Sequence, residues 1–395
     1  MRRPELLAPA GDLERLRIAL RYGADAVYLG GQPYSLRSRT AVFPLDSIRE
    51  GVLYAHSLGK KVYVTVNAVF REEDLLGLRD YLDSLDDIGV DGVIVTAPAA
   101  VAETSAHPRM SFHLSTQQSV TNIETVRFWA KTGIRRIVLA RELDLGEIAE
   151  IVAQSPIECE VFIHGGMCSS YSGRCTLSNE MTGRDANRGG CAHSCRWTYS
   201  LVRGEDPLLG APAFSLGAKD LQAVRFIPAL CAMGVASLKI EGRMKSPHYV
   251  ATVVSVYRRL IDDVMAGRLL ALDTYDSLLA RGENRPTGPG FFEGIPGPEQ
   301  QLSDPGAPKP SQSFVAIVEG YDPSLGMATV SQRNVFSIGD LLEHFSPAGE
   351  LRQFRLIDLR DAEGMAIERA SHPQEMLRMS VPWPVEPLDM FRKVN

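Results

Sequence analysis

"ELLAPAGDLERLRIALRYGADAVYLGG", residues 5–31, carries the pattern that decides the fold. A short aliphatic run, Glu5–Ala8, is followed by an amphipathic helical pattern, and a second aliphatic run begins at Ala26. The turn "YGAD" separates the helix from the second run, and its glycine can end a helix in the left-handed conformation. The order of strand, helix and strand predicts one βα unit of a parallel sheet.

The same unit recurs along the chain. The runs that are typical of strands are Glu5–Ala8, Ala26–Leu29, Lys61–Val66, Gly92–Thr96, Met110–Leu114, Arg136–Ala140, Cys159–Ile163 and Ser237–Ile240. These eight runs predict an α/β fold of the (β/α)8, TIM-like class, whose chemistry lies at the C-terminal ends of the strands. The competing fold is an open doubly wound sheet, but no G-x-G-x-x-G motif follows the first predicted strand.

Two features interrupt this rhythm. The interval 164–236, between the seventh and eighth predicted strands, is far longer than an ordinary connection and contains a cluster of cysteines. Later, a Pro- and Gly-rich stretch precedes short runs separated by turn residues, which are typical of a small β-barrel. We therefore predict a barrel domain over 1–300, a linker over 301–313 and a small all-β, barrel-like domain over 314–395.

Composition limits the classes of protein to consider. The chain has 395 residues, 45% of them hydrophobic and 23% charged, and no apolar run approaches the roughly 20 residues that cross a bilayer. Its first residues lack the pattern of a signal peptide, so we expect a cytoplasmic protein without membrane contact. The net charge of −6 argues weakly against a nucleic-acid partner, although local basic patches can override it.

Four of the six cysteines are spaced Cys168-x6-Cys175-x15-Cys191-x3-Cys195. In a reducing compartment such a cluster is more typical of metal or redox chemistry than of disulfides. Zinc is one interpretation, yet only Cys191 and Cys195 have the close spacing of a zinc knuckle. A 4Fe-4S cluster on a glycine-rich loop is another, and unligated thiols are a third. Cys159 and Cys231 lie in apolar runs, where cysteine serves as a small hydrophobe.

Polar residues follow the predicted strands and would face a common mouth. They are Asn67, His113, Ser115, Gln117, Arg141, Glu142, His164, Lys239, Glu241 and Arg243. Each has a structural alternative: Glu142 could cap a helix, and His113 could be a core histidine. Lys239 lies between apolar neighbours inside a strand, so its ammonium must meet an anion. We select as candidate catalytic residues Lys239, Glu241, His164 and Arg141.

The cysteine-rich interval is also locally basic and aromatic. Arg174 and Tyr199 lie in it, together with the four residues that we select as candidate RNA contacts, Arg184, Arg188, Arg196 and Trp197. Guanidinium groups can hold backbone phosphates while an unstacked base packs on an aromatic ring. The structural alternative is a solvated loop with Trp197 packed inward.

Several long motifs carry a resemblance to a known family. "EVFIHGGMCSSYSGRCTLSN" resembles the signature of the collagenase-like peptidase family of unassigned catalytic type. "RDANRGGCAHSCRWTY" and "SLKIEGRMKSPHYVATVVSVYRRLIDD" are similar to its branch of prephenate-dependent tRNA uridine 5-hydroxylases. The resemblance extends from "ELLAPAGD" at the start to "PLDMFRKVN" at the end.

The resemblance implies an oxidoreductase-type tRNA modification enzyme that works without molecular oxygen. It would form 5-hydroxyuridine at the wobble position of the tRNA anticodon loop, with prephenate as oxygen donor. It also implies a 4Fe-4S cofactor whose metal ligands are Cys168, Cys175, Cys191 and Cys195. Other branches hydroxylate ribosomal RNA or a quinone precursor, and the lack of a long extra C-terminal region favours tRNA.

A collagenase-like peptidase is the alternative function. The sequence contains neither H-E-x-x-H nor G-x-S-x-G, the motifs that would indicate a zinc protease or a serine hydrolase. The cysteines that could act as nucleophiles are those best explained as ligands. The best remaining candidate for proteolysis is a pairing of Cys168 with His164.

Overall fold

Eight parallel strands close into a barrel in the computed structural model, which describes residues 2–32, 34–36, 42–204, 206–207, 213–282, 285–302, 312–347, 349 and 351–394. The barrel strands are β1 (Glu5–Pro9), β2 (Ala26–Gly30), β3 (Lys61–Val66), β4 (Gly92–Val95), β5 (Ser111–Leu114), β6 (Arg136–Val138), β7 (Glu158–Gly165) and β11 (Ser237–Ile240). β11 pairs with both β1 and β7, which closes the sheet. The predicted (β/α)8 fold is confirmed.

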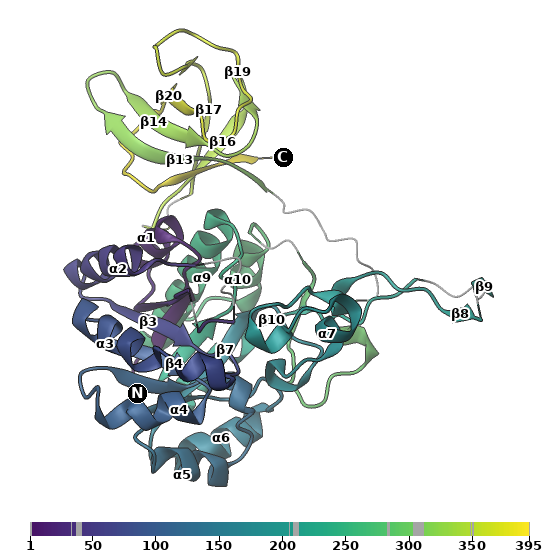
Figure 1. Ribbon diagram of the computed structural model, residues 1–395. Coiled ribbons are helices and arrows are strands. Elements are labelled where there is room, and N and C mark those ends of the chain that lie inside the picture. Colours follow the sequence, from purple (N-terminus) through teal and green to yellow (C-terminus); the bar gives the residue numbers. More distant parts are fainter. Residues whose placement is uncertain are drawn as a thin grey trace.

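Helices surround the barrel (Figure 1). They are α1 (Leu13–Arg21), α2 (Leu45–Ser57), α3 (Leu78–Ile88), α4 (Pro98–Val101), α5 (Ile123–Ala130), α6 (Leu145–Gln154), α8 (Ile227–Met233), α9 (Pro247–Met265) and α10 (Leu272–Leu279). Their ends follow sequence chemistry: the Asp12 side chain accepts a hydrogen bond from Arg15 N at the start of α1. Gly89 ends α3 at φ 88°. The core lies between these helices and the strands.

The barrel interior is charged in its N-terminal half. We call the cluster of Glu5, Arg136, Glu158, Glu160 and Lys239 the ionic floor. Arg136 contacts all three carboxylates, at 2.5 Å from Glu5, 2.7 Å from Glu158 and 3.3 Å from Glu160. Lys239 Nζ lies 2.9 Å from Glu160 Oε1. The charges are paired, as burial requires.

The long interval after β7 folds over the C-terminal end of the barrel. It contains α7 (Leu177–Thr182), the short helical turns η4 (Tyr171–Gly173), η5 (Ala186–Arg188), η6 (Ser194–Arg196) and η7 (Val224–Phe226), and the strands β8 (Val202–Arg203), β9 (Asp206–Pro207) and β10 (Asp220–Gln222). β10 extends the barrel sheet by pairing antiparallel with β7 and parallel with β12 (Thr287–Gly288). β8 and β9 lie at the tip of an arm that points away from the barrel (Figure 1).

The C-terminal region is an all-β domain, as predicted. Its strands are β13 (Gln312–Asp322), β14 (Met327–Gln332), β15 (Phe336–Ser337), β16 (Leu341–Phe345), β17 (Arg352–Arg355), β18 (Leu359–Arg360), β19 (Arg369–Ala370), β20 (Met376–Ser380) and β21 (Met390–Val394). Seven of them form an antiparallel sheet in the order β17-β16-β21-β13-β14-β20-β18. Most of the predicted linker, 303–311, lies outside the described residues.

Buried polar contacts join this domain to the barrel. Arg392 in β21 donates to His248 Nε2 at 2.7 Å and to Thr252 Oγ1 at 2.9 Å, both on α9. Tyr22, next to α1, donates its hydroxyl to Phe345 O. In the part of the chain that the structure describes, no helix has the length and apolarity needed to span a membrane.

Candidate functional site

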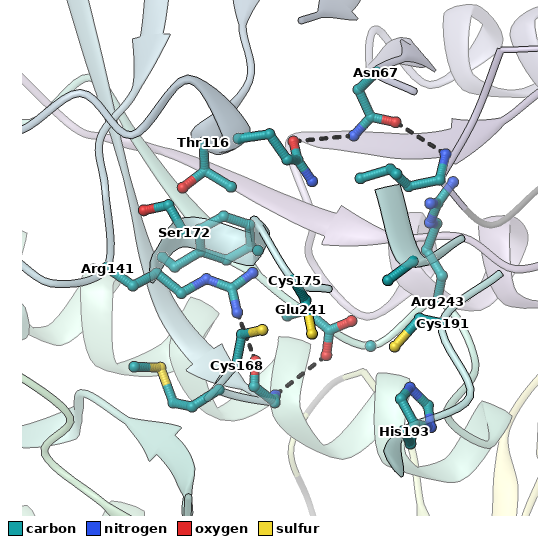
Figure 2. A pocket seen from close by; sticks show the side chains of 18 of the residues that line it. Asn67, Thr116, Arg141, Cys168, Ser172, Cys175, Cys191, His193, Glu241 and Arg243 are labelled. Atoms are coloured by element: carbon teal, nitrogen blue, oxygen red, sulfur yellow. Dashed lines mark hydrogen bonds between the residues drawn. The ribbon is translucent and has the colours of Figure 1, made fainter. Parts of the chain in front are cut away.

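One pocket gathers most of the polar residues that the sequence singled out (Figure 2). It has a volume of about 420 Å³ and lies at the C-terminal ends of the barrel strands. Thr65, Asn67 and Lys239 belong to its barrel side, and the insertion supplies the opposite wall. This is the end of a (β/α)8 barrel at which active sites form.

All four clustered cysteines line this pocket. Figure 2 shows the thiols of Cys168, Cys175 and Cys191 in one region of it. Although Cys168 is exposed as a residue, burial of its sulfur raises the pKa of the thiol, and the neighbouring Cys175 and Cys195 act in the same direction. The insertion therefore brings together cysteines that are separated along the chain.

The geometry of these thiols bears on which cofactor they fit. Among the described residues, no three His, Cys, Asp or Glu side chains are grouped so that they could hold one metal ion. A 4Fe-4S cluster spreads its thiolate ligands over separate irons, so four cysteines around one open pocket are a donor set that it can use.

A glycine allows the chain to turn from β7 into the cysteine-rich loop. Gly165 has φ 104°, and a Cβ at this position would lie 2.4 Å from the carbonyl oxygen of Glu241. No other residue fits such a close approach of two backbones. The turn fixes where Gly166 and then Cys168 enter the pocket.

Two of the candidate catalytic residues hold the next residue of this loop, Gly166. Glu241 Oε2 accepts a hydrogen bond from Gly166 N at 3.1 Å, and Arg141 Nη1 donates to Gly166 O at 2.6 Å. The Arg141 guanidinium also lies 3.9 Å from the centre of the Phe162 ring. Arg141 and Glu241 thus grip both ends of Gly166, two residues before Cys168, and both line the pocket (Figure 2). Arg141 Nε is buried and has no partner among the described residues.

Lys239 lies at the bottom of the pocket, where the pocket meets the ionic floor. Its counter-ion is Glu160: burial would raise the pKa of this carboxyl, but Lys239 and Arg136 outweigh burial and lower it to about 2. Burial lowers the pKa of Lys239, and Glu160 opposes that shift. The anion that the sequence required for Lys239 is therefore provided by the protein itself.

His164 does not join the other candidate catalytic residues. Its Nδ1 lies 3.2 Å from the hydroxyl of Tyr257 on α9, its ring packs against Tyr249 and Tyr257, and it is not among the pocket residues. Burial lowers its pKa to about 3. The pairing of β7 with β11 shifts register between Phe162 and His164, and this extra residue reverses the alternation of inward and outward side chains. The expectation that His164 faces the mouth is therefore wrong.

His113 is a core histidine, the alternative that the sequence left open. Its Nε2 lies 3.0 Å from Ser111 Oγ, and its ring packs at 4.6 Å against Tyr63 inside the barrel. Burial lowers its pKa well below the usual range. Glu142 instead accepts hydrogen bonds from the backbone N and the Oγ of Ser172, so it holds the turn η4 against the mouth.

The candidate RNA contacts separate into two groups. Arg188 pairs with Asp74 and Glu73, which holds the insertion to the barrel. Arg196 lies 3.7 Å from Asp220 on β10, so it joins two parts of the insertion. Arg184 is exposed, and Trp197 keeps 41% of its surface exposed. Trp197 is therefore not packed fully inward, and Arg184 and Trp197 are the two exposed members of the predicted contact set.

The pocket also contains residues that were not predicted from the sequence. They include Tyr28, His193, Lys245 and Arg285. Lys245 lies in "EGRMKS", directly after the eighth strand, and this position was a usable signal. Arg285 comes from a segment before β12 that only the tertiary fold brings to the mouth.

Comparison with known proteins places the chain in a family. The model of peptidase family U32 matches residues 11–302, and the model of the U32 C-terminal domain matches residues 310–392. The chain belongs to peptidase family U32. It is 45% identical to "tRNA hydroxylation protein P1" of Bacillus subtilis, over 99% of this chain and 95% of that protein.

Two relatives come from Escherichia coli. The U32 chain is 35% identical to "tRNA hydroxylation protein P", over 98% of this chain and 95% of the relative. It is 37% identical to "23S rRNA 5-hydroxycytidine C2501 synthase", over 67% of this chain but 40% of that protein. The expected family is confirmed.

For a U32 chain, the peptidase alternative needs a nucleophile and a base in one place. Cys168 faces the pocket, whereas His164 lies behind the β7 wall against Tyr257. The pairing of Cys168 with His164 that proteolysis would use therefore has its two members on different sides of a strand.

Proposed function

We propose that the chain is an iron–sulfur-dependent RNA hydroxylase that acts without molecular oxygen. It places a hydroxyl group on carbon 5 of the uridine at the tRNA wobble position, with prephenate as oxygen donor. Full-length similarity to proteins named for tRNA hydroxylation supports the class of reaction. The observation that carries the proposal is that all four cysteines open on the same pocket as the strand-end cations.

The pocket suits a flipped base together with a small dianion. Its volume of about 420 Å³ lies within the range of small-molecule sites, roughly 300–1,000 Å³. Arg243 Nη1 donates to Ser35 Oγ at 3.0 Å and to Thr65 Oγ1 at 3.1 Å, which fixes its guanidinium at the pocket wall. Arg141 lines the same opening, and so does Lys245, whose ammonium lies 3.4 Å from Asp220 Oδ2. These groups would bind the carboxylates of prephenate.

The cysteines would hold the cofactor at one side of the bound base. Cys168, Cys175, Cys191 and Cys195 are the proposed ligands, and the cluster, when bound, supplies one-electron redox chemistry or an electrophilic iron. Glu241 and Arg141 fix the loop that carries Cys168 through Gly166. The insertion covers the pocket and limits the access of water to the reacting carbon. A wobble base reaches such a pocket only after it leaves the anticodon stack.

The RNA would approach across the insertion. Arg184 and Trp197 are the exposed members of the predicted contact set, so we assign them to the anticodon loop. Arg188 and Arg196 support this surface from below through their pairs with Asp74 and Asp220.

The test combines cofactor analysis with nucleoside analysis. Protein purified without oxygen is expected to be brown, with about four irons and four sulfides per chain, and Cys191→Ser is expected to lose them. In a strain that lacks the gene and any redundant enzyme, wild type restores 5-hydroxyuridine in tRNA, measured by mass spectrometry of nucleosides, and Cys191→Ser does not. Cys231→Ala is the matched control, because Cys231 is a buried cysteine that does not line the pocket.

Two outcomes would contradict the proposal. If 5-hydroxyuridine in tRNA is unchanged in the deletion strain, the chain does not catalyse the tRNA reaction. If a hydroxylated base is instead missing from the ribosomal RNA of the same cells, ribosomal RNA is the substrate. One relative is named for such a ribosomal reaction. Cleavage of collagen by iron-free wild-type protein would instead support the peptidase function.

A further inference from the structure

A chain of hydrogen bonds runs along the barrel side of the pocket. The backbone N of Leu36 donates to Asn67 Oδ1 at 3.2 Å, and Asn67 Nδ2 donates to Gln117 Oε1 at 3.4 Å (Figure 2). Ser115 Oγ donates to the same oxygen of Gln117. Asn67, Ser115 and Gln117 all line the pocket.

This chain fixes which way each amide points. A backbone N–H can only donate, so the atom of Asn67 that faces Leu36 must be the carbonyl oxygen. The amino group of Asn67 then faces Gln117, and Gln117 must present its own oxygen to it. Turning over the Gln117 amide would place two amino groups against each other. The orientation of Gln117 is therefore determined by an unambiguous donor two residues away in the chain of bonds.

The other end of the Gln117 amide is the one left for a ligand. No described residue accepts a hydrogen bond from Gln117 Nε2. Gly173, with φ 81°, lies opposite: a Cβ there would be 4.0 Å from Nε2. The pocket side of Gln117 thus offers two N–H donors and no acceptor.

We propose that Gln117 selects uracil over cytosine by donating to the oxygen on carbon 4 of the base. Uracil carries an acceptor at this position, whereas cytosine carries an amino group that only donates. Carbon 4 adjoins carbon 5, so the reading contact lies beside the carbon that is hydroxylated. The inference rests on the proposed function and adds to it the residue that defines the base. Asn67 and Ser115 act as positioning residues through Oε1 of Gln117.

The opposing donors predict a measurable preference. A buried donor left facing an amino group loses its hydrogen bond, and such a loss weakens binding by about 10- to 100-fold. Gln117→Glu keeps an oxygen for Asn67 and Ser115 but replaces the pocket-facing donor with an acceptor. This variant is expected to reverse the preference and accept cytosine. Gln117→Leu is expected to remove the preference without reversing it.

The experiment uses the cluster-loaded full chain, prephenate and two anticodon stem-loops that differ only in U or C at the target position. The first readout is the ratio of 5-hydroxyuridine to 5-hydroxycytidine formed in competition, and the second is the affinity of each stem-loop. Gln118→Glu is the matched control: it adds the same charge one residue away, on an amide that donates to Thr96 O at 2.7 Å and does not line the pocket. Its U-to-C ratio is expected to equal that of wild type. Iron content and melting temperature check that each variant is folded.

The results separate the inference from the function on which it rests. If wild type hydroxylates uridine and both Gln117→Glu and Gln117→Leu have the U-to-C ratio of wild type, Gln117 does not select the base. The proposed hydroxylase function would still stand. Wild type could instead be inactive but bind the U stem-loop more tightly than the C stem-loop, with the opposite preference in Gln117→Glu. That result would refute the hydroxylase and support base selection by Gln117. Asn67→Ala sharpens the test, because a Gln117 amide that is free to turn over is expected to bring the ratio toward one.

Discussion

The two ends of the barrel interior differ in how fully their hydrogen-bond donors are paired. In the ionic floor, Arg136 and Lys239 are matched by three carboxylates within 3.3 Å. At the mouth, Arg141 Nε has no partner among the described residues, and the amino group of Gln117 is unused by any of them. Saturated buried charges serve the fold, whereas donors that stay unsatisfied beside a pocket indicate a ligand. Lys239 reaches the pocket, but because Glu160 neutralises it, it belongs mainly to the fold.

Breaking the ionic floor should have the largest effect on stability. Glu160→Gln leaves Lys239 and Arg136 buried with less negative charge, and breaking a buried pair in this way costs about 3–5 kcal/mol of unfolding free energy. The measurement is denaturant unfolding of wild type and variant. Glu158→Gln is the matched control, because Glu158 also pairs with Arg136 but keeps 34% of its side chain exposed. A loss below about 1 kcal/mol for Glu160→Gln would show that the charges of the floor are not tightly coupled.

The sequence was sufficient where local pattern decides structure. The strand Lys61–Val66 was predicted with the bounds that the structure has, because β-branched and aromatic residues mark it without help from distant contacts. The four cysteines were also predicted to act together, and they line one pocket.

The sequence was not sufficient where distant contacts decide orientation. His164 turns outward because of a register shift against β11, and no property of residues 158–165 alone shows that shift. Likewise, Arg188 and Arg196 look like RNA contacts until Asp74 and Asp220, on other segments, are seen to pair with them. The role inferred for Gln117 depends on the backbone N–H of Leu36, which only the fold brings near Asn67.

Lowering the pH should destabilise the ionic floor, with a somewhat smaller effect on the unfolding free energy than Glu160→Gln. The pKa of Glu160 is about 2 in the folded chain, against about 4.3 for an unfolded glutamate. The unfolded chain therefore binds this proton more readily, so the contribution of Glu160 is complete above about pH 4.3 and is lost as pH falls toward 2. Its size is about 3 kcal/mol.

The check is the unfolding free energy between pH 6 and pH 2 for wild type and Glu160→Gln. The advantage of wild type over the variant should shrink across this range, whereas Glu363→Gln, which alters an exposed carboxylate, should follow wild type at every pH. An advantage that stayed constant down to pH 2 would mean that Glu160 is not held ionised by Lys239 and Arg136.

Loosening the mouth should have the smallest effect, and a local one. Arg141→Met keeps the stem that packs on Phe162 but removes the hydrogen bond to Gly166 O, and a bond to a charged donor contributes about 1.5 kcal/mol. Because Glu241 and Arg141 hold the N–H and the carbonyl oxygen of Gly166, the loss of one bond should open the loop before Cys168 without unfolding the barrel. Hydrogen exchange of a peptide covering 165–170 should speed up about tenfold, while exchange in the ionic floor and the denaturant midpoint stay unchanged. Arg184→Met, which removes an exposed arginine from the same insertion, should leave both regions as in wild type. If Arg141→Met instead lowered global stability by the same amount as local protection, the mouth and the ionic floor would open as one cooperative unit, and the division between a fold-bearing end and a ligand-bearing end would not hold.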